Sequence, residues 1–381
     1  MNIQCLDEKN RMLHSQVAQR IKEYLESGAI GAGEKLETEN ELARKFGVSR
    51  PTIRQALSTL QREGYIDRIH GKGTFISEKL NTGELNNRQE KNIYMIVPHF
   101  SGNFIGRIAA GVQEVILKKG YRLTLYATND QIEQEGAFIK ELIVKRADGL
   151  IIHPTRNHYY NPAVFELYQK NIPIVMTGRY YRYLDTSFVA ADNYRGAYEA
   201  VSYLIELGHR HIGLVSKEPT IETSQEDRIR GFRDALSDHN LVIERKLLLN
   251  NLKDERSVFL GEHHEVQEKI VQEQLNKFIE NSPEMTAVFA TNGLIAASVI
   301  KTAKQCNRIV GSDLSVLGFD NDSVSANLDP ALTTIDWPTL EIGRRAARIM
   351  IEHMENPSMG TRKEYLPTKL IIRESCSKVN C

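Results

Sequence analysis

The first 78 residues carry apolar side chains at the spacing of surface helices. Between positions 13 and 25 these side chains recur every three or four residues, and glycines follow at positions 28, 31 and 33. The spacing predicts a helix with one buried stripe that ends before the glycines. Thr38 and Glu41 fit a capping box, in which each side chain bonds the other residue's backbone amide. We therefore expect a second helix to begin there and to end by Gly47.

A third helix is predicted directly after the second. Ser49 is a suitable N-cap, and Pro51 fits a first turn, whose amides have no partner within the helix. Four apolar residues follow at positions i, i+3, i+4 and i+7 and predict a side that faces a core: Ile53, Ala56, Leu57 and Leu60. After Gly64, the runs YIDRI and TFI flank a tight HGKG turn. This arrangement predicts a two-stranded ribbon that completes a domain over residues 1–78.

From residue 92 onward, short apolar runs alternate with amphipathic segments. Seven runs have the length and composition of buried strands: IYMIV, YRLTLYAT, GLIIHP, IPIVMTG, HIGLVS, TAVFATN and LSVLGFD. Strands that alternate with helices predict parallel sheets built from βαβ units. The length of residues 92–381 exceeds that of a usual single sheet, so we expect two α/β lobes with a cleft between them. The polar segment 79–91 has no apolar period and is expected to be a linker.

The charge of the chain is balanced overall but not locally. The 49 basic and 49 acidic residues cancel, so attraction to nucleic acid must come from one region. Residues 44–72 hold seven basic residues against two acidic ones. Arg50 and Arg54 lie on the polar side of the third predicted helix, where they can reach guanine edges or phosphates. Other basic side chains suit the DNA backbone or the minor groove: Arg44, Lys45, His70 and Lys72.

The competing interpretation of this region is the solvated face of a small helical domain. A single run of charge usually has that structural role. Here a capped helix, a second helix and a basic hairpin follow one another in the order that a DNA-reading domain requires. We therefore favour double-stranded DNA as the partner of residues 1–78.

Polar and aromatic residues follow several of the predicted strands. In open α/β lobes, ligands bind beyond the carboxyl ends of the strands, so these residues are candidates for a binding site. They are His99, Phe104, Arg156, Arg179, Tyr180, Asn292 and Asp320. Aromatic rings beside amides, carboxylates and guanidinium groups suit a sugar, which offers C–H faces and neighbouring hydroxyls. Each also has a structural interpretation, such as a turn at Asp320 or a surface ion pair at Arg228.

The N-terminal segment resembles the winged helix-turn-helix domain of GntR-type bacterial transcription regulators. The resemblance covers about residues 13–77 and rests on four blocks at the spacing of that family: TENELA, GVSRPTIRQAL, EGYI and GKGTF. It implies that a group of residues contacts DNA: Asn40, Ser49, Arg50, Thr52, Arg54, His70 and Gly71. The resemblance therefore assigns the same function to this domain as its charge pattern does.

The region from about residue 92 to residue 375 resembles the effector domain of LacI/GalR-type regulators, which is related to periplasmic sugar-binding proteins. Segments that carry this resemblance include ADGLIIHP, ADNYRGAYEAVSYLIELGHRHIGLV, DRIRGFRDAL, LTTIDWP and LPTKLIIRES. It implies a two-lobed α/β fold in which Arg228, Asn292 and Asp320 are polar ligand contacts of the second lobe.

A GntR-type domain joined to a LacI/GalR-type domain is the architecture of arabinose-responsive repressors of Gram-positive bacteria. HPTRNHYYNP and GRYYRYLD are similar to segments of that group, which places Arg156 and Tyr180 near the sugar. The resemblance implies a homodimer that a small sugar releases from operator DNA, and we expect L-arabinose or a related pentose. An activator that responds to sugar is the alternative, and a sugar-transforming enzyme is a more remote one.

Several other functions lack their sequence signatures. There is no GxGxxG after a strand, no GxxxxGK[ST] frame, no GxSxG and no HExxH, so we expect no catalytic site and no cofactor. The four cysteines are scattered and lack metal-ligand spacing, so no metal is expected. The chain has no apolar run long enough to span a bilayer and no secretory signal at its start, so we expect a cytoplasmic protein without a membrane partner.

Overall fold

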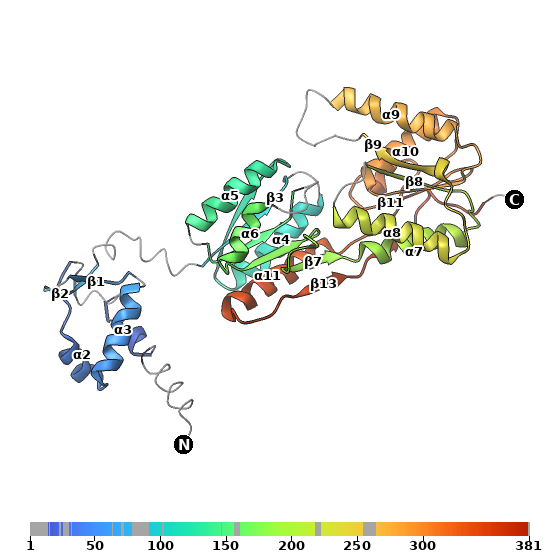
Figure 1. Ribbon diagram of the computed structural model, residues 1–381. Coiled ribbons are helices and arrows are strands. Elements are labelled where there is room, and N and C mark those ends of the chain that lie inside the picture. Colours follow the sequence, from blue (N-terminus) through green and yellow to red (C-terminus); the bar gives the residue numbers. More distant parts are fainter. Residues whose placement is uncertain are drawn as a thin grey trace, which may run out of the picture. The chain divides into compact units, whose positions relative to one another are not determined.

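The computed structural model describes residues 14, 16–22, 24–25, 30–31, 33–62, 64–69, 72–77, 91–100, 103–145, 147–155, 161–217, 222–253 and 264–379. Three of the predicted site residues lie outside these ranges: His70, Gly71 and Arg156. So does the predicted linker at 79–91, apart from its last residue. The chain forms two units, residues 1–91 and residues 92–381 (Figure 1).

The first unit contains a three-helix core and a hairpin. Residues 16–22 are helical, α2 spans Glu39–Phe46 and α3 spans Arg50–Arg62. Strands β1 (Ile66–Ile69) and β2 (Gly73–Ile76) pair antiparallel and form the wing. The four residues predicted to face the core are each at most 1% exposed: Ile53, Ala56, Leu57 and Leu60.

The predicted helix boundaries of this unit follow from local hydrogen bonds. The Thr38 amide donates to the Glu41 carboxylate at 2.8 Å, and the Glu41 amide donates to the Thr38 hydroxyl at 3.4 Å, which confirms the capping box. Gly47 ends α2 in the left-handed conformation at φ 67°, which glycine adopts without a Cβ penalty. At the start of α3, the Thr52 amide donates to the Ser49 hydroxyl at 3.4 Å.

The second unit contains two six-stranded sheets (Figure 1). Every neighbouring pair in the first sheet is parallel. In order, its strands are β13 (Lys363–Leu366), β7 (Ser187–Ala191), β6 (Ile174–Thr177), β5 (Gly149–Ile152), β3 (Asn92–Val97) and β4 (Arg122–Ala127). With it lie α4 (Asn103–Lys118), α5 (Ile132–Val144), α6 (Pro162–Gln169) and α11 (Thr339–Glu355). We call this the N-terminal lobe.

The second sheet forms the C-terminal lobe and is parallel except at one edge, where β14 runs antiparallel to β12. Its strands, in order, are β14 (Lys369–Ile371), β12 (Thr333–Asp336), β11 (Ser315–Phe319), β10 (Ala287–Ala290), β8 (Ile212–Lys217) and β9 (Leu248–Leu252). Its helices are α7 (Asn193–Glu206), α8 (Thr223–Asp238), α9 (His264–Glu280) and α10 (Gly293–Gln305), with short 3₁₀ turns η3 (Arg245–Leu247) and η4 (Ser325–Asn327).

All seven predicted strands are present, but five further strands were not predicted. The missed strands are β7, β9, β12, β13 and β14. Of these, β13 and β14 are short, half-exposed edge strands, so they lack the apolar run that identifies a buried strand.

The chain crosses between the lobes three times, after β7, after β12 and after β13 (Figure 1). The second crossing brings α11 back against α4 in the N-terminal lobe. These two helices touch through glycines, because a Cβ on Gly111 would lie 2.1 Å from the Leu340 carbonyl oxygen and one on Gly343 would lie 2.0 Å from that of Ile108. These three connections at one boundary bring the two sheets together so that the ends of their strands face one another.

Candidate effector site and nucleic-acid interface

A cavity of about 360 Å³ lies between the two lobes, at the carboxyl ends of their strands. Its size falls at the lower end of the range for small-molecule sites. The N-terminal lobe contributes His99, His153 and Arg179, which follow β3, β5 and β6. The C-terminal lobe contributes Lys217, the last residue of β8, together with Asn292 and Asp320, which follow β10 and β11.

Of the eight candidate effector residues, six line this cavity: His99, Phe104, Arg179, Arg228, Asn292 and Asp320. The structure therefore brings together side chains that are far apart in the sequence. It shows their common location, whereas their contacts with a ligand remain predictions. Another candidate, Arg156, lies outside the described residues.

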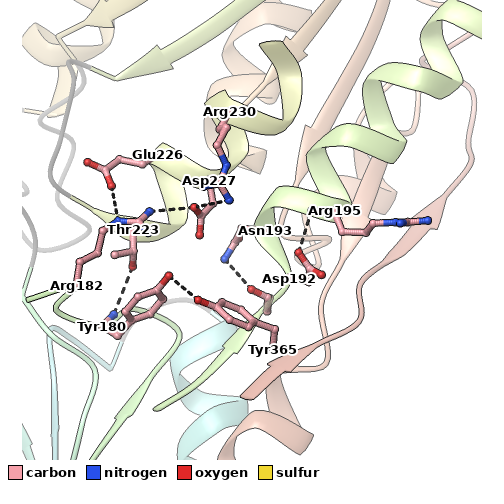
Figure 2. A network of polar contacts seen from close by, with 11 residues as sticks. Tyr180, Arg182, Asp192, Asn193, Arg195, Thr223, Glu226, Asp227, Arg230 and Tyr365 are labelled. Carbon is pink, nitrogen blue, oxygen red and sulfur yellow. Dashed lines mark hydrogen bonds and ion pairs between the residues drawn. The ribbon is translucent and has the colours of Figure 1, made fainter. Parts of the chain in front are cut away.

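The remaining candidate, Tyr180, does not line the cavity. Its ring stacks on Phe188 with centroids 4.0 Å apart, and its hydroxyl lies 2.8 Å from that of Tyr365 (Figure 2). The neighbouring residue Arg179 lines the cavity instead. Gly178, at φ 69°, turns the chain at the end of β6 and thereby decides which of the two successive side chains faces the cavity.

Arg228 and Asp320 form the central polar pair of the cavity. The Arg228 Nη2 atom lies 3.0 Å from Asp320 Oδ1, and the guanidinium group stacks 3.7 Å from the ring centroid of Phe319. The same guanidinium donates to Asn193 Oδ1 at 2.9 Å and to the Thr291 carbonyl at 2.6 Å. Arg228 is thus held in one orientation by three partners.

Burial raises the pKa of Asp320 above its ordinary value, while the charge of Arg228 opposes this rise. Asp320 is also strained, because its φ of 92° lies in the left-handed region that favours glycine. Such a conformation costs on the order of 1–3 kcal/mol and persists where the surroundings enforce it. Here the Asp320 amide donates to the Ile335 carbonyl at 2.9 Å, which holds the residue at the cavity wall.

Two other charged and polar residues of the cavity already have partners. Arg179 pairs with Glu222 at 3.4 Å across the lobe boundary, and both side chains are largely buried. Asn292 caps α10, since its Oδ1 accepts from the Ile295 amide at 2.8 Å. The side-chain nitrogen of Asn292 remains available for a ligand while the oxygen is committed to the helix.

Three buried polar atoms on the cavity wall have no hydrogen-bond partner among the described residues: Trp337 Nε1, Thr339 Oγ1 and Gln225 Oε1. Buried polar groups are nearly always bonded, so orphans that face a cavity indicate where a ligand or water bonds. None of these three residues was predicted from the sequence as a ligand contact. Trp337 lies directly after β12 and packs against Phe104 with ring centroids 5.7 Å apart. Its position after a strand would have identified it, had β12 been predicted.

The first unit presents arginines from α3 and from the wing. Arg50 and Arg54 of α3 are exposed, and both lie near the Glu39 carboxylate, at 3.8 and 3.1 Å. Arg68 of β1 lies 3.5 Å from the same carboxylate. The sequence pattern did not indicate Glu39, because an acidic residue has no obvious place on a DNA-binding face. Here its single carboxylate holds three arginine side chains close together.

The other predicted DNA contacts occupy different environments. Asn40, Arg44, Ser49 and Lys72 are exposed. Thr52 is buried, at 9% exposed, with its hydroxyl 2.8 Å from that of Ser49, so its side chain faces the domain rather than solvent. Lys45 pairs with Glu37 at 2.5 Å and lies 3.7 Å from the ring centroid of Tyr24. DNA would therefore have to compete with these partners for Lys45.

The described part of the chain contains no group of three or more His, Cys, Asp or Glu residues able to hold a metal ion. In the same residues, no helix is both long enough and apolar enough to cross a membrane.

Each of the two units matches a known protein family. Residues 13–76 match the gntR family of bacterial regulatory proteins, and residues 201–376 match the periplasmic binding protein-like domain. The arabinose metabolism transcriptional repressor of Geobacillus stearothermophilus is 31% identical over 98% of this chain and 100% of its own length. The protein of the same name from Halalkalibacterium halodurans is 27% identical over 95% of this chain and 96% of its own.

Among solved structures, a LacI family transcriptional regulator from Enterococcus faecium with bound ribose aligns with a TM-score of 0.63. The alignment covers 76% of this chain and 100% of that structure. At 23% sequence identity, this likeness supports the fold alone.

A helix-turn-helix with a wing, joined to a two-lobed domain that encloses a cavity, defines a DNA-binding regulator with an effector domain. The chain belongs to the GntR family of bacterial transcription regulators, in the group whose second domain is of the LacI/GalR, periplasmic-binding-protein-like type. It is a transcriptional repressor of this sugar-responsive type and not an enzyme. These findings confirm the resemblance and the fold class inferred from the sequence.

Proposed function

We propose that the chain acts in the cytoplasm as a homodimer that binds operator DNA through α3 and the wing, and that a small neutral sugar releases it. We further propose that the sugar is a pentose, with L-arabinose as the first candidate. The observation that carries this proposal is the set of unpartnered polar atoms on the cavity wall: Trp337 Nε1, Thr339 Oγ1 and Gln225 Oε1. A sugar supplies hydroxyls that both donate to and accept from such groups.

The charges of the cavity favour a neutral ligand. Arg228 is neutralised by Asp320 and Arg179 by Glu222, so neither guanidinium needs an anionic ligand. An aromatic wall formed by Phe104 and Trp337 lies beside these pairs and suits the C–H face of a sugar ring. The choice of a pentose is supported by the names of the two curated relatives and by the ribose bound to the E. faecium regulator.

Release follows from linkage between the two sites. A ligand that contacts both lobes favours their closed arrangement, and an effector that alters operator affinity must have its own affinity altered by DNA by the same factor. Couplings of this kind are typically on the order of 1–3 kcal/mol. In a dimer, a change of lobe angle alters the spacing of the two recognition helices, and half-sites about one turn of ~10 bp apart tolerate little misplacement.

The test combines operator binding with a sugar panel. Full-length protein is footprinted on DNA upstream of its own gene, and the protected fragment is then titrated by fluorescence anisotropy with L-arabinose, D-xylose, D-ribose, D-glucose and cellobiose. We expect L-arabinose to weaken operator binding and the hexose and disaccharide to have no effect. Tighter operator binding with sugar would indicate the activator alternative, and no response to any sugar would contradict the proposal.

One variant separates the two halves of the proposed function. Arg54→Ala should weaken operator binding by about 1–3 kcal/mol, as loss of a base-contacting arginine does, while sugar binding stays at the wild-type level. Sugar binding is followed by the fluorescence of Trp337, the one tryptophan of the sequence. Wild-type operator affinity in Arg54→Ala would exclude Arg54 from the DNA interface.

A further inference from the structure

A set of polar contacts outside the cavity joins the two lobes. The segment between β6 and β7 belongs to the N-terminal lobe and lies against the first turn of α8, in the C-terminal lobe (Figure 2). Arg182 pairs with Glu226 at 3.0 Å and with Asp227 at 2.9 Å, and the Tyr180 amide lies 3.4 Å from Thr223 Oγ1. We call these five residues the interlobe seam. None of them lines the cavity.

The seam is anchored firmly on its N-terminal side. The Arg182 guanidinium carbon lies 5.8 Å from the ring centroid of Tyr180, whose stacking on Phe188 fixes it against the first sheet. Tyr180 was expected to contact the effector. Its observed contacts place it in the seam, where it supports Arg182.

On the C-terminal side, the same turn of α8 faces both the seam and the cavity. Asp227 points to Arg182, whereas the next residue, Arg228, and Gln225, two residues before Asp227, line the cavity. Moving this turn of helix would therefore move two candidate ligand contacts. Asp227 is 6% exposed, so separating it from Arg182 removes a partner from a largely buried carboxylate. Arg230, 3.4 Å away on the same helix, remains as its second partner and limits damage to the lobe itself.

We propose that Arg182 is a positioning residue for effector binding: by fastening α8 to the β6–β7 segment, it sets how readily the lobes close and hence the affinity for a ligand it does not touch. The apparent affinity for a ligand of the closed form scales with the fraction of molecules that are closed. Removing Arg182 lowers that fraction. The test below has two arms. The first arm needs no ligand, whereas the second arm measures sugar binding and rests on the proposed function.

The first arm needs no ligand. Trp337 lies on the second crossing between the lobes and is 7% exposed, so acrylamide quenching of its fluorescence reports opening of the boundary. We expect Arg182→Ala in the full-length protein to be quenched more strongly than the wild type. The matched control is Arg195→Ala, because Arg195 is also an exposed arginine with an acidic partner, Glu199 at 2.7 Å, but this pair lies within α7. Equal quenching in the wild type and both variants would overturn the proposal.

The second arm measures affinity for L-arabinose and D-ribose by calorimetry. We expect Arg182→Ala to bind about three- to tenfold more weakly than the wild type, the range for a partly exposed ion-pair network, and Arg195→Ala to bind normally. Arg182→Lys should recover part of the loss. The double variant Arg182→Ala/Asp227→Asn should bind no more weakly than Arg182→Ala, because the two residues act as one pair.

The two arms distinguish the possible failures. If neither sugar binds the wild type but Arg182→Ala is more strongly quenched, the proposed sugar is wrong and the seam stands. If a sugar binds and Arg182→Ala binds it with wild-type affinity, the positioning role is wrong. The role is also wrong if the double variant loses as much affinity as the losses of its two single variants added together.

Discussion

The Glu39 carboxylate lies 3.1 Å from the Arg54 guanidinium, so an acidic residue stands at the centre of the basic face of the first unit. Hydrogen bonding from Arg54 lowers the pKa of Glu39 below its ordinary value, and Arg68 and Arg50 act in the same direction. Glu39 therefore stays ionised at neutral pH and restrains cations that would otherwise be free to contact any phosphate.

Replacing Glu39 by Gln should reduce discrimination between operator and other DNA. The released arginines gain freedom, so affinity for a scrambled duplex should rise. The slope of log affinity against log salt concentration should also become steeper by about one. Operator affinity should gain less, so the specificity ratio should fall. Anisotropy titrations on both duplexes at several KCl concentrations measure this ratio. Glu34→Gln, which changes an exposed acid that bonds the Gly31 amide, is the control. An unchanged ratio in Glu39→Gln would show that Glu39 does not organise the arginines.

Thr339→Val should weaken sugar binding without destabilising the protein. The Thr339 hydroxyl is buried and has no protein partner in the described residues, so its loss breaks no internal hydrogen bond. A sugar that bonds this hydroxyl would lose about 1–3 kcal/mol of binding free energy. Thr291→Val is the matched control, because the Thr291 hydroxyl is equally buried and unbonded but does not line the cavity. Calorimetry and thermal melting provide the two readouts, and equal affinities in both variants would exclude Thr339 from the site.

Arg228→Ala should lower the stability of the second unit by about 3–5 kcal/mol, since it leaves the Asp320 carboxylate without its cation in a largely buried site. Asp320→Asn should cost less, because Asn keeps the shape and an acceptor for the guanidinium. Urea unfolding followed by Trp337 fluorescence measures the free energy of unfolding of this unit. A smaller loss for Arg228→Ala than for Asp320→Asn would contradict the importance assigned to the pair.

Gly343→Ala should destabilise the N-terminal lobe by about 3 kcal/mol or more, because the added methyl group meets a backbone oxygen that no side-chain rotation can move. Gly106 on α4 offers the matched control, since a Cβ there meets nothing within 4 Å. Gly106→Ala should instead stabilise by about 0.5–1 kcal/mol through the higher helix propensity of Ala. Thermal unfolding of both variants is the measurement, and similar melting temperatures would refute the close helix contact.

The carboxylate of Glu114 should titrate near pH 2. Lys118, at 2.8 Å, and Arg344 on α11, at 2.7 Å, lower its pKa from an ordinary value of 4.5 to about 2. Since the folded value is the lower one, the stabilisation is complete above the unfolded pKa and is lost as pH falls toward 2. Titration of carbon-13-labelled glutamate by NMR checks this value, and Arg344→Ala should raise it. A wild-type value near 4.5 would show that the pair does not form in solution.

Local patterns in the sequence predicted the elements that local forces determine. The capping box at Thr38 and the stripe from Ile53 to Leu60 depend on residues within one or two turns, and both are present in the structure. Six of the seven predicted strands are buried in parallel sheets, which is why their apolar runs were clear. The seventh, β4, is an edge strand without a buried residue.

The remaining features depend on contacts between distant residues. The three crossings place α11 and β13 in the lobe that begins at residue 92, and no local pattern encodes that return. The choice between Arg179 and Tyr180 as the cavity residue depends on the turn at Gly178. Glu39 and Arg182 were missed for a similar reason, since the role of each comes from partners on other elements.

The second crossing also bears on how the protein is made. A ribosome completes residues 1–91 first, so the DNA-reading unit has its whole core long before the rest of the chain emerges. The N-terminal lobe, by contrast, lacks α11 and its edge strand β13 until residue 366 has been synthesised. A chain that stalls in the last fifth of translation therefore carries a finished DNA reader and an unfinished sensor.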